Sequence, residues 1–263
     1  MGFTNGVTTC SFFKYPNDNG IIYSSTHVDN PDCPPKPDFS RGYIWKLYPG
    51  FNIFEAGLGG SNPRPLTSSP GYDAEATYSF DGKKIIYTSL VSGDLEVWSM
   101  NPDGSGKQQL TNRLGYDGGA FYSFDASKIV WRAYYPETEE EIADYKSLLA
   151  ENSIRPMALQ IWTMNANGTN KKQITDNNSA NFGPIYFPKA DKIIFSSNMH
   201  DPKGRDFDLY SINIDGTDLE RITYFEGFDG FPMFSPNGQY LVFSSNRNQN
   251  KRGDTNIFIC EWK

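Results

Sequence analysis

The sequence has few residues of the kinds that metal centres and nucleophilic catalysts use. Its 263 residues include two histidines and three cysteines. It contains no Gly-x-Ser-x-Gly elbow, no His-Glu-x-x-His motif, no phosphate-binding glycine loop and no paired-cysteine zinc pattern. We therefore expect no catalytic residues of these classes, no bound metal and no cofactor, and the sequence favours binding over catalysis without deciding between them.

The charge balance and the hydropathy exclude further classes of partner. Lys and Arg total 24 and Asp and Glu total 31, which gives a formal net charge of −7. Since binding to phosphates relies on neutralisation by Lys and Arg, an acidic chain with no basic tract fits neither nucleic acid nor an anionic membrane surface. No apolar run approaches the roughly 18 residues needed to cross a bilayer, so we expect no membrane insertion. The first residues also lack the basic and apolar segments of a signal peptide.

Glycine, proline and aromatic residues are abundant, and a repeat organises them. Aromatic residues make up 15% of the sequence, with 24 Gly and 17 Pro, which is typical of short strands joined by tight turns. A Gly-containing turn followed by Leu/Ile-Thr occurs four times, ending at Thr67, Thr111, Thr175 and Thr223, and Phe3-Thr4 resembles the end of the same unit. Successive threonines are 63, 44, 64 and 48 residues apart. The base unit is therefore about 44 residues, with about 20 more inserted twice.

Each unit contains four predicted strands. In the second unit they are residues 76–80, 84–89, 95–100 and 108–111, and Asp81-Gly82 is a strong hairpin signal between the first two. The third strand recurs in five copies, at Ile53-Phe54, Val97-Trp98, Ile161-Trp162, Leu209-Tyr210 and Ile257-Phe258.

Four antiparallel strands in about 45 residues are typical of a β-propeller blade. We therefore predict an all-β propeller with five visible blades, closed as a five- or six-bladed ring. The single domain spans residues 1–263, with blades at approximately 6–67, 71–111, 115–175, 179–223 and 228–263. Residues 1–5 would supply the missing fourth strand of the last blade and so remove a sheet edge.

Two segments also resemble a known repeat. Residues 78–85 and 234–238 are similar to the Phe-Ser-Pro-Asp-Gly hairpin of the TolB-like propeller repeat family, which is related to WD-type repeats. Residues 100–105 with Leu110-Thr111 resemble its Met-Asn-Ala-Asp-Gly-Ser…Leu-Thr segment. The resemblance covers nearly the whole chain and implies the propeller fold.

One face of the predicted blades carries all the long loops. Connections from the second to the third strand and from the fourth strand to the next blade emerge on this side, which we call the insertion face. The second-to-third connections are residues 26–51, 133–159, 198–207 and 246–255. Long loops on a rigid scaffold commonly bind ligands. The insertion of the third blade contains the one predicted helix. Thr138 and Glu141 form a capping box at its start, and Arg155-Pro156 ends it. Its apolar stripe consists of Ile142, Tyr145, Leu148 and Leu149.

The connections between blades carry a repeated acid. Asp73, Asp117 and Asp229 follow Gly-Tyr or Gly-Phe, with Asn181 and Thr8 at the corresponding places, and Glu75 stands beside Asp73. If the first strand is innermost, these residues surround the channel mouth, where they would attract cations or amines and where Ca²⁺ is a possible ligand. The alternative is that each acid caps its own turn through local hydrogen bonds.

Two histidines and two arginines also lie on the predicted insertion face. His27 and His200 follow the second strands of blades one and four, with Asp29 and Asp201 near them in the sequence. Arg132 and Arg247 stand at similar places. The histidines could act in acid–base chemistry, and the arginines could hold a carboxylate or form ion pairs between blades. Because the two histidines lie three blades apart, we do not expect them to share a metal ion.

The cysteines favour an oxidising compartment. Cys10 and Cys33 belong to the same blade and face, so a disulfide between them would clamp the first insertion, whereas Cys260 lies in a strand and is expected to be buried. Such a pair favours the periplasm or the outside of the cell.

Three functional interpretations follow. The first is a non-catalytic binding propeller that recognises a protein, peptide or glycan, with a basic partner favoured by the acidic insertion face. The second is a hydrolase or lyase that uses the acids at the channel mouth, and the third is a structural or assembly module of a larger extracellular protein.

Overall fold

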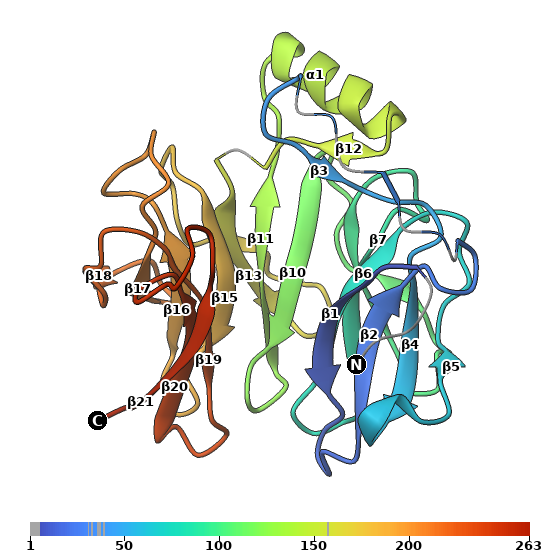
Figure 1. The fold of residues 1–263 in the computed structure, drawn as a ribbon, viewed down its shortest axis with the longest axis horizontal. Coiled ribbons are helices and arrows are strands. Elements are labelled where there is room, and N and C mark those ends of the chain that lie inside the picture. Colours follow the sequence, from blue (N-terminus) through green and yellow to red (C-terminus); the bar gives the residue numbers. More distant parts are fainter. Residues whose placement is uncertain (1–5, 31, 33, 36–37, 39, 157) are drawn as a thin grey trace. The chain divides into compact units, whose positions relative to one another are not determined.

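The fold is all-β with one helix, as the repeat predicts. The computed structural model describes residues 6–30, 32, 34, 35, 38, 40–156 and 158–263. Within this part of the chain, four sheets have four antiparallel strands each and a fifth has three (Figure 1). Among the same residues, no helix has the length and apolar character needed to cross a membrane.

The strands follow the chain from sheet to sheet. In the four-stranded sheets the order is sequential, so each strand pairs with the one before and after it. The sheets are β1 (Thr8–Phe13), β2 (Gly20–Ser25), β4 (Asn52–Gly57) and β5 (Arg64–Pro65); β6 (Asp73–Tyr78), β7 (Ile85–Ser89), β8 (Glu96–Met100) and β9 (Gln108–Gln109); β10 (Tyr116–Tyr122), β11 (Lys128–Tyr134), β13 (Gln160–Asn165) and β14 (Lys172–Gln173); β15 (Asn181–Tyr186), β16 (Lys192–Ser197), β17 (Asp208–Asn213) and β18 (Glu220–Arg221); and the three-stranded β19 (Asp229–Phe234), β20 (Tyr240–Ser245) and β21 (Asn256–Glu261).

The chain divides into two compact units. One comprises Met1–Ala120 with Ala133–Pro156, and the other Phe121–Arg132 with Met157–Lys263. Each has its own apolar core, and the central strands of the sheets are buried on both faces. The core of the first unit includes Ile22, Ile53, Tyr78, Ile85 and Met100, and that of the second includes Val130, Ile161, Ile193, Phe195 and Tyr210.

The repeated threonine fixes the fourth strand of each blade to the third. In the fourth sheet, Thr223 Oγ1 accepts a hydrogen bond from the backbone N–H of Leu209 at 3.0 Å and donates to Asp208 Oδ1 at 2.9 Å. The same acceptor bond from the second residue of the third strand recurs at Thr67, Thr111 and Thr175, at 2.8–2.9 Å. A buried hydroxyl that accepts from the backbone explains why the signature demands Thr.

A β-bulge interrupts the first strand of the sheets. The register shifts between Ala74 and Thr77 in β6, and corresponding shifts occur in β1, β15 and β19. The bulged residue adopts a left-handed conformation, with φ 58° at Glu75 and φ 54° at Phe231, while Gly119 and Gly183 occupy the same place in β10 and β15. In blade two the first strand begins three residues earlier than predicted, at Asp73 rather than Ala76, because the bulged Glu75 breaks the alternation that marks a strand. The repeated acids thus lie at the start of strands and not in the connections.

The two long insertions of the first unit fold together as a cap. Within it β3 (Trp45–Lys46) pairs with β12 (Ser153–Ile154), and α1 (Glu139–Ala150) packs beside β12 (Figure 1). The capping box at Thr138 and Glu141 is confirmed. The helix ends at Ala150 instead of continuing to Arg155-Pro156, because Asn152 turns left-handed (φ 52°) and the chain then enters β12.

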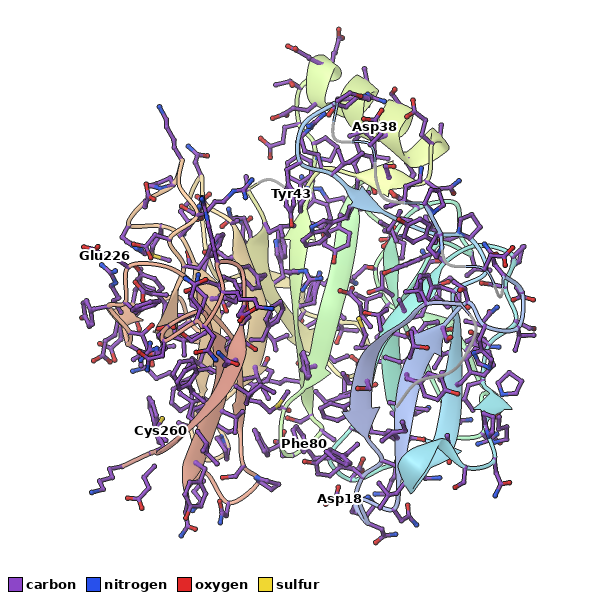
Figure 2. All side chains as sticks on the ribbon, in the orientation of Figure 1. Asp18, Asp38, Tyr43, Phe80, Glu226 and Cys260 are labelled. Atoms are coloured by element: carbon purple, nitrogen blue, oxygen red, sulfur yellow. The ribbon has the colours of Figure 1, made fainter. Side chains whose placement is uncertain are left out.

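The last sheet has three strands among the described residues. Residues 1–5, which the sequence suggests as its fourth strand, lie outside them, as does Cys33 of the predicted Cys10–Cys33 disulfide. Cys260 lies in a strand as predicted, but the expectation that it is buried is wrong, since β21 is an edge strand and the cysteine is exposed (Figure 2).

Candidate functional site

The repeated acids are buried at the start of the first strand of their sheets. Asp73 is 2% exposed and Asp117 and Asp229 are 0% exposed. Asp73 accepts hydrogen bonds from Ser69 Oγ at 2.8 Å and from Ser89 Oγ at 2.5 Å. The partners of Asp73 are therefore hydroxyls, one of them on the adjacent strand, rather than the turn backbone that local capping would use.

The same position is filled differently in the other sheets. Asn181 Oδ1 accepts from Ser197 Oγ at 2.7 Å, and Thr8 Oγ1 donates to Ser25 Oγ at 3.0 Å. In the last sheet Arg247 forms a charge-assisted hydrogen bond with Asp229. The ion pair of Arg247 thus lies within one blade and not between two, and a role for Arg247 in holding a ligand's carboxylate stays a prediction.

An acidic cluster lies beneath the helix of the cap. Glu96, 3% exposed, lies close to Asp117 and Thr111, and both influence its ionisation. Burial, followed by the negative charges of Asp117 and Asp94, raises the pKa of Glu96 to about 8. The raised pKa indicates that the Glu96–Asp117 pair holds a proton near neutral pH, which explains how two carboxyl groups can share a buried site.

Two tyrosines complete this cluster. Tyr135 donates to Asp117 Oδ1 at 2.6 Å. The Tyr145 hydroxyl, on α1, lies 2.5 Å from Asp94 Oδ1 and 2.6 Å from the carbonyl oxygen of Gly115. Burial raises the pKa of both Tyr145 and Asp94. The cluster therefore attaches the helix to the second blade through hydrogen bonds that require protonated donors.

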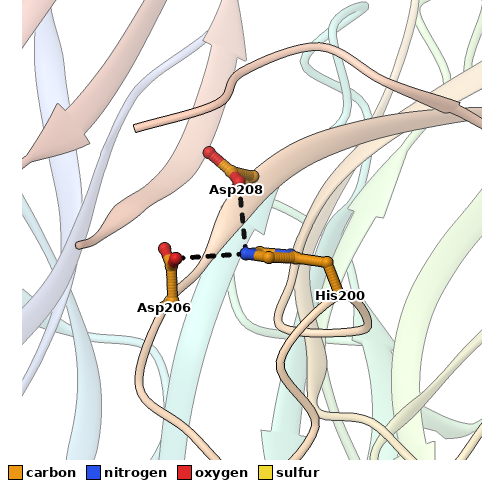
Figure 3. Close-up of side chains that lie close together, drawn as sticks. All are labelled: His200, Asp206 and Asp208. Carbon is orange, nitrogen blue, oxygen red and sulfur yellow. Dashed lines mark ion pairs between the residues drawn. The ribbon is translucent and has the colours of Figure 1, made fainter. Parts of the chain in front are cut away.

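A second polar cluster lies in the insertion of the fourth blade. His200 Nε2 is 3.3 Å from Asp206 Oδ2 and 3.4 Å from Asp208 Oδ2 (Figure 3). His200 Nδ1 lies 3.0 Å from the Tyr210 hydroxyl. The sequence points to His200, but the neighbouring acids are these two and not Asp201.

The donor set of this cluster resembles a metal site, and its charge pattern argues against one. His and two carboxylates within 4.8 Å of one another could ligate a divalent ion. However, Arg221 donates twice to Asp208 Oδ2, and Asp208 Oδ1 accepts from Thr223 and from the backbone of Phe225. A cation would have to displace the guanidinium, so the arrangement fits an ionic network better than a metal centre.

The remaining predicted residues have structural contacts. His27 Nδ1 lies 2.9 Å from Ser25 Oγ, its ring lies 4.4 Å from that of Phe54, and burial lowers its pKa. Glu75 Oε2 accepts from Thr88 Oγ1 at 3.0 Å and from the backbone N–H of Gly119 at 2.9 Å. Arg132 is buried, with 7% exposure.

The cap presents exposed polar side chains. Arg155 binds Asp144 of α1 at 3.0 Å, and Arg41 of the first insertion binds Glu151 at 3.0 Å, so the two insertions are linked. Tyr43 is 61% exposed and lies below α1 (Figure 2). The acids Glu137, Glu139, Glu140 and Glu141 around the helix N-terminus are exposed.

Sequence reasoning missed Asp94, Glu96, Asp206 and Asp208. A signal was present, because Asp94-Leu95-Glu96 and Asp206-Phe207-Asp208 both place two acids around the start of a third strand. In both blades the first acid accepts from the backbone N–H of the next connection, at Gly115 and Gly227.

Comparison with known proteins defines the fold. No protein-family model matches the sequence, and no curated protein matches it. Among solved structures, a TolB protein from Agrobacterium tumefaciens has a TM-score of 0.66 at 16% identity, over 97% of this chain and 77% of that one. TolB from Acinetobacter baumannii gives 0.63 at 16% identity, over 83% of this chain and 49% of that one. A chain of a nidogen/laminin complex gives 0.62 at 12% identity, over 98% and 86%. The chain spans about half the length of the second of these TolB structures, and it has the fold of a TolB-like β-propeller.

Proposed function

We propose that this chain is a non-catalytic binding propeller and that it recognises a basic protein or peptide segment through the cap. The observation that carries the proposal is the exposed carboxylate group at the N-terminus of α1, formed by Glu137, Glu139 and Glu140. Ion pairs of Arg41 with Asp144 and Glu151 tie α1 to the first insertion. Arg113 lies 3.9 Å from Glu137, whereas Glu139 and Glu140 form no ion pair within the described part of the chain. The cap is anchored by β3–β12 pairing, so these charges are held on a rigid platform.

The raised pKa of Glu96 is the observation that favours a hydrolase or lyase. A protonated carboxyl near neutral pH can act as a general acid. Yet Glu96 and Asp117 are 3% and 0% exposed, and Tyr145 and Tyr135 hydrogen-bond to acids of the same cluster. Substrate would have no access to the reactive oxygens, so we assign this pair to attachment of the cap.

We also propose that the protein is located in the periplasm or outside the cell. A clamp between Cys10 and Cys33 would form in such an oxidising compartment and would restrain the first insertion. The mass of the purified protein before and after reduction and alkylation tests the pairing.

Charge reversal tests the proposed binding surface. Glu139→Lys/Glu140→Lys should weaken binding of a fluorescent Lys-rich octapeptide. The charge-matched control Asp218→Lys/Glu220→Lys, in the β17–β18 turn and at the first residue of β18, should not. Binding should also fall as salt is raised from about 0.05 to 0.5 M, since exposed charges are screened. Equal weakening by the two double variants would show that only the net charge matters and would refute a specific site.

A further inference from the structure

Two loops of the second unit, which we call the cationic loops, carry exposed basic side chains. Lys203 and Arg205 lie on the connection between β16 and β17, and Lys251 and Arg252 lie on the connection between β20 and β21. All four side chains are exposed. None of the four forms an ion pair with an acid among the residues that the structure describes. Their charge is therefore available to a partner.

The segment between β18 and β19 joins the two cationic loops. On one side, the backbone N–H of Phe207 donates to the carbonyl oxygen of Gly227 at 2.8 Å, and the N–H of Gly227 donates to Asp206 Oδ1 at 3.0 Å. On the other side, the N–H of Asn246 donates to the carbonyl oxygen of Phe228 at 3.1 Å, and the N–H of Phe228 donates to Asn246 Oδ1 at 2.9 Å. The two loops are thus fixed to one segment, and their cations belong to one surface of the second unit.

The acids of this region do not neutralise the exposed cations. Asp208 and Asp229 are 0% exposed and form ion pairs with Arg221 and Arg247. In the two loops and the segment between them, all of which the structure describes, Glu226 is the exposed acid (Figure 2). The outward-facing charge of this surface is therefore mainly positive, although the whole chain has a net charge of −7.

Neighbouring lysines elsewhere in the chain are held by local contacts. Lys84, which follows Lys83, donates to Asn101 Oδ1 at 2.9 Å. Lys172 donates to the carbonyl oxygen of Asp215 at 2.9 Å. The cationic loops therefore differ from these places, because their neighbouring basic side chains have no such local acceptor in the part of the protein that is described.

The cap carries the complementary charge, at the exposed Glu139 and Glu140 of α1. We propose that the protein associates with a second copy of itself, the cap of one copy binding the cationic loops of the other. Opposite charges favour this pairing and disfavour cap on cap or loops on loops. The contact joins two different surfaces and is therefore heterologous. The inference rests on the proposed function, since it names the basic segment that the cap binds.

Sedimentation equilibrium of the full chain tests this association. We expect the chain to associate at about 0.05 M salt and to dissociate at about 0.5 M, because exposed charges are screened. Glu139→Lys/Glu140→Lys and Arg205→Glu/Lys251→Glu should each weaken association about tenfold, because attraction at two charges becomes repulsion. These variants change the net charge in opposite directions, so weakening by both identifies a contact between the two surfaces and not an effect of overall charge.

A mixture of the two double variants gives the sharpest comparison. The chain with Arg205→Glu/Lys251→Glu keeps a native cap, and the chain with Glu139→Lys/Glu140→Lys keeps native cationic loops. One native contact can therefore form between the two chains, and the mixture should associate under conditions in which neither variant does so alone. Recovery on mixing also shows that both variants are folded.

The charge-matched control Lys107→Glu/Lys189→Glu reverses two exposed cations outside the cationic loops and should associate as the native chain does. A chain that stays monomeric at low salt, a control that weakens association equally, or a mixture that does not associate would each overturn the inference. A monomer whose loops bind a Glu-rich octapeptide would assign the loops to a different acidic protein and would overturn it as well. If a monomeric chain binds the Lys-rich octapeptide through Glu139 and Glu140, the proposed function stands and this inference fails; if it does not, both fail.

Discussion

Replacement of Thr175 by Val should destabilise the second unit through one unsatisfied backbone group. Thr175 is 4% exposed; its Oγ1 accepts from the N–H of Ile161 at 2.9 Å and donates to Gln160 Oε1 at 2.8 Å. Val has nearly the same shape but neither accepts nor donates, so the buried N–H of Ile161 loses its partner at a cost of about 1–3 kcal/mol. Thr175→Ser keeps both hydrogen bonds and loses one methyl group, which costs about 0.8 kcal/mol.

The assay must report on this strand, because a chain of two compact units need not unfold in one step. Native-state hydrogen exchange at the Ile161 amide gives the opening free energy directly. We expect faster exchange in Thr175→Val than in Thr175→Ser, and a melting temperature lower by about 2–4 °C for each kcal/mol lost. If Thr175→Val is as stable as Thr175→Ser, the hydroxyl is not what the repeated signature preserves, and our explanation of the repeat is wrong.

Three further changes test the buried charges. The pKa of Glu96 is about 8 in the folded protein, against an ordinary value of 4.5. Between pH 4.5 and 8 the folded state binds this proton and the unfolded state does not. The free energy of unfolding therefore falls as the pH rises through this range. Glu96→Gln should therefore gain stability relative to the native protein from pH 5 to 8 in urea titrations, and a constant difference would contradict the assignment. Tyr145→Phe should cost about 1–2 kcal/mol and expose α1 to limited proteolysis, since the hydroxyl bonded to Asp94 is lost; unchanged cleavage would argue against attachment through this group. Arg247→Met should cost about 3–5 kcal/mol by leaving Asp229 charged and unpaired, with the double variant Arg247→Met/Asp229→Asn recovering most of the loss in thermal unfolding.

Local signals in the sequence predicted the blades well. The turn residues, the Leu/Ile-Thr ends and the capping box at Thr138 act over a few residues, and each appears in the structure where the sequence indicates. The start of the first strand was predicted too late because the bulged Glu75 breaks the alternation that marks a strand. Pairing of Trp45 with Ile154 brings together two irregular loops far apart in sequence, and no local pattern encodes such a contact.

The candidate site was predicted less completely, for a similar reason. A single residue such as His200 can be recognised by its chemistry, but its partners were sought among sequence neighbours, at Asp201, when the fold brings Asp206 and Asp208 to it. The pair of acids around the start of a third strand occurs in two of the five copies, so it gives a weaker repeat signal than the acid that begins three of the first strands.

The position of the repeated acid shows what the scaffold requires there. Asp73 and Asn181 both accept from a serine hydroxyl that ends the adjacent strand, so an uncharged amide meets the same structural need as a carboxylate. Where the acid is kept, it is compensated locally, by hydroxyls at Asp73 and by Arg247 at Asp229. A buried charge compensated in this way contributes little field outside the protein. The acids at the starts of the first strands therefore attract a basic partner weakly, whereas the exposed carboxylates around the start of α1 face solvent, which is why the proposed binding surface is the cap and not the ends of the first strands.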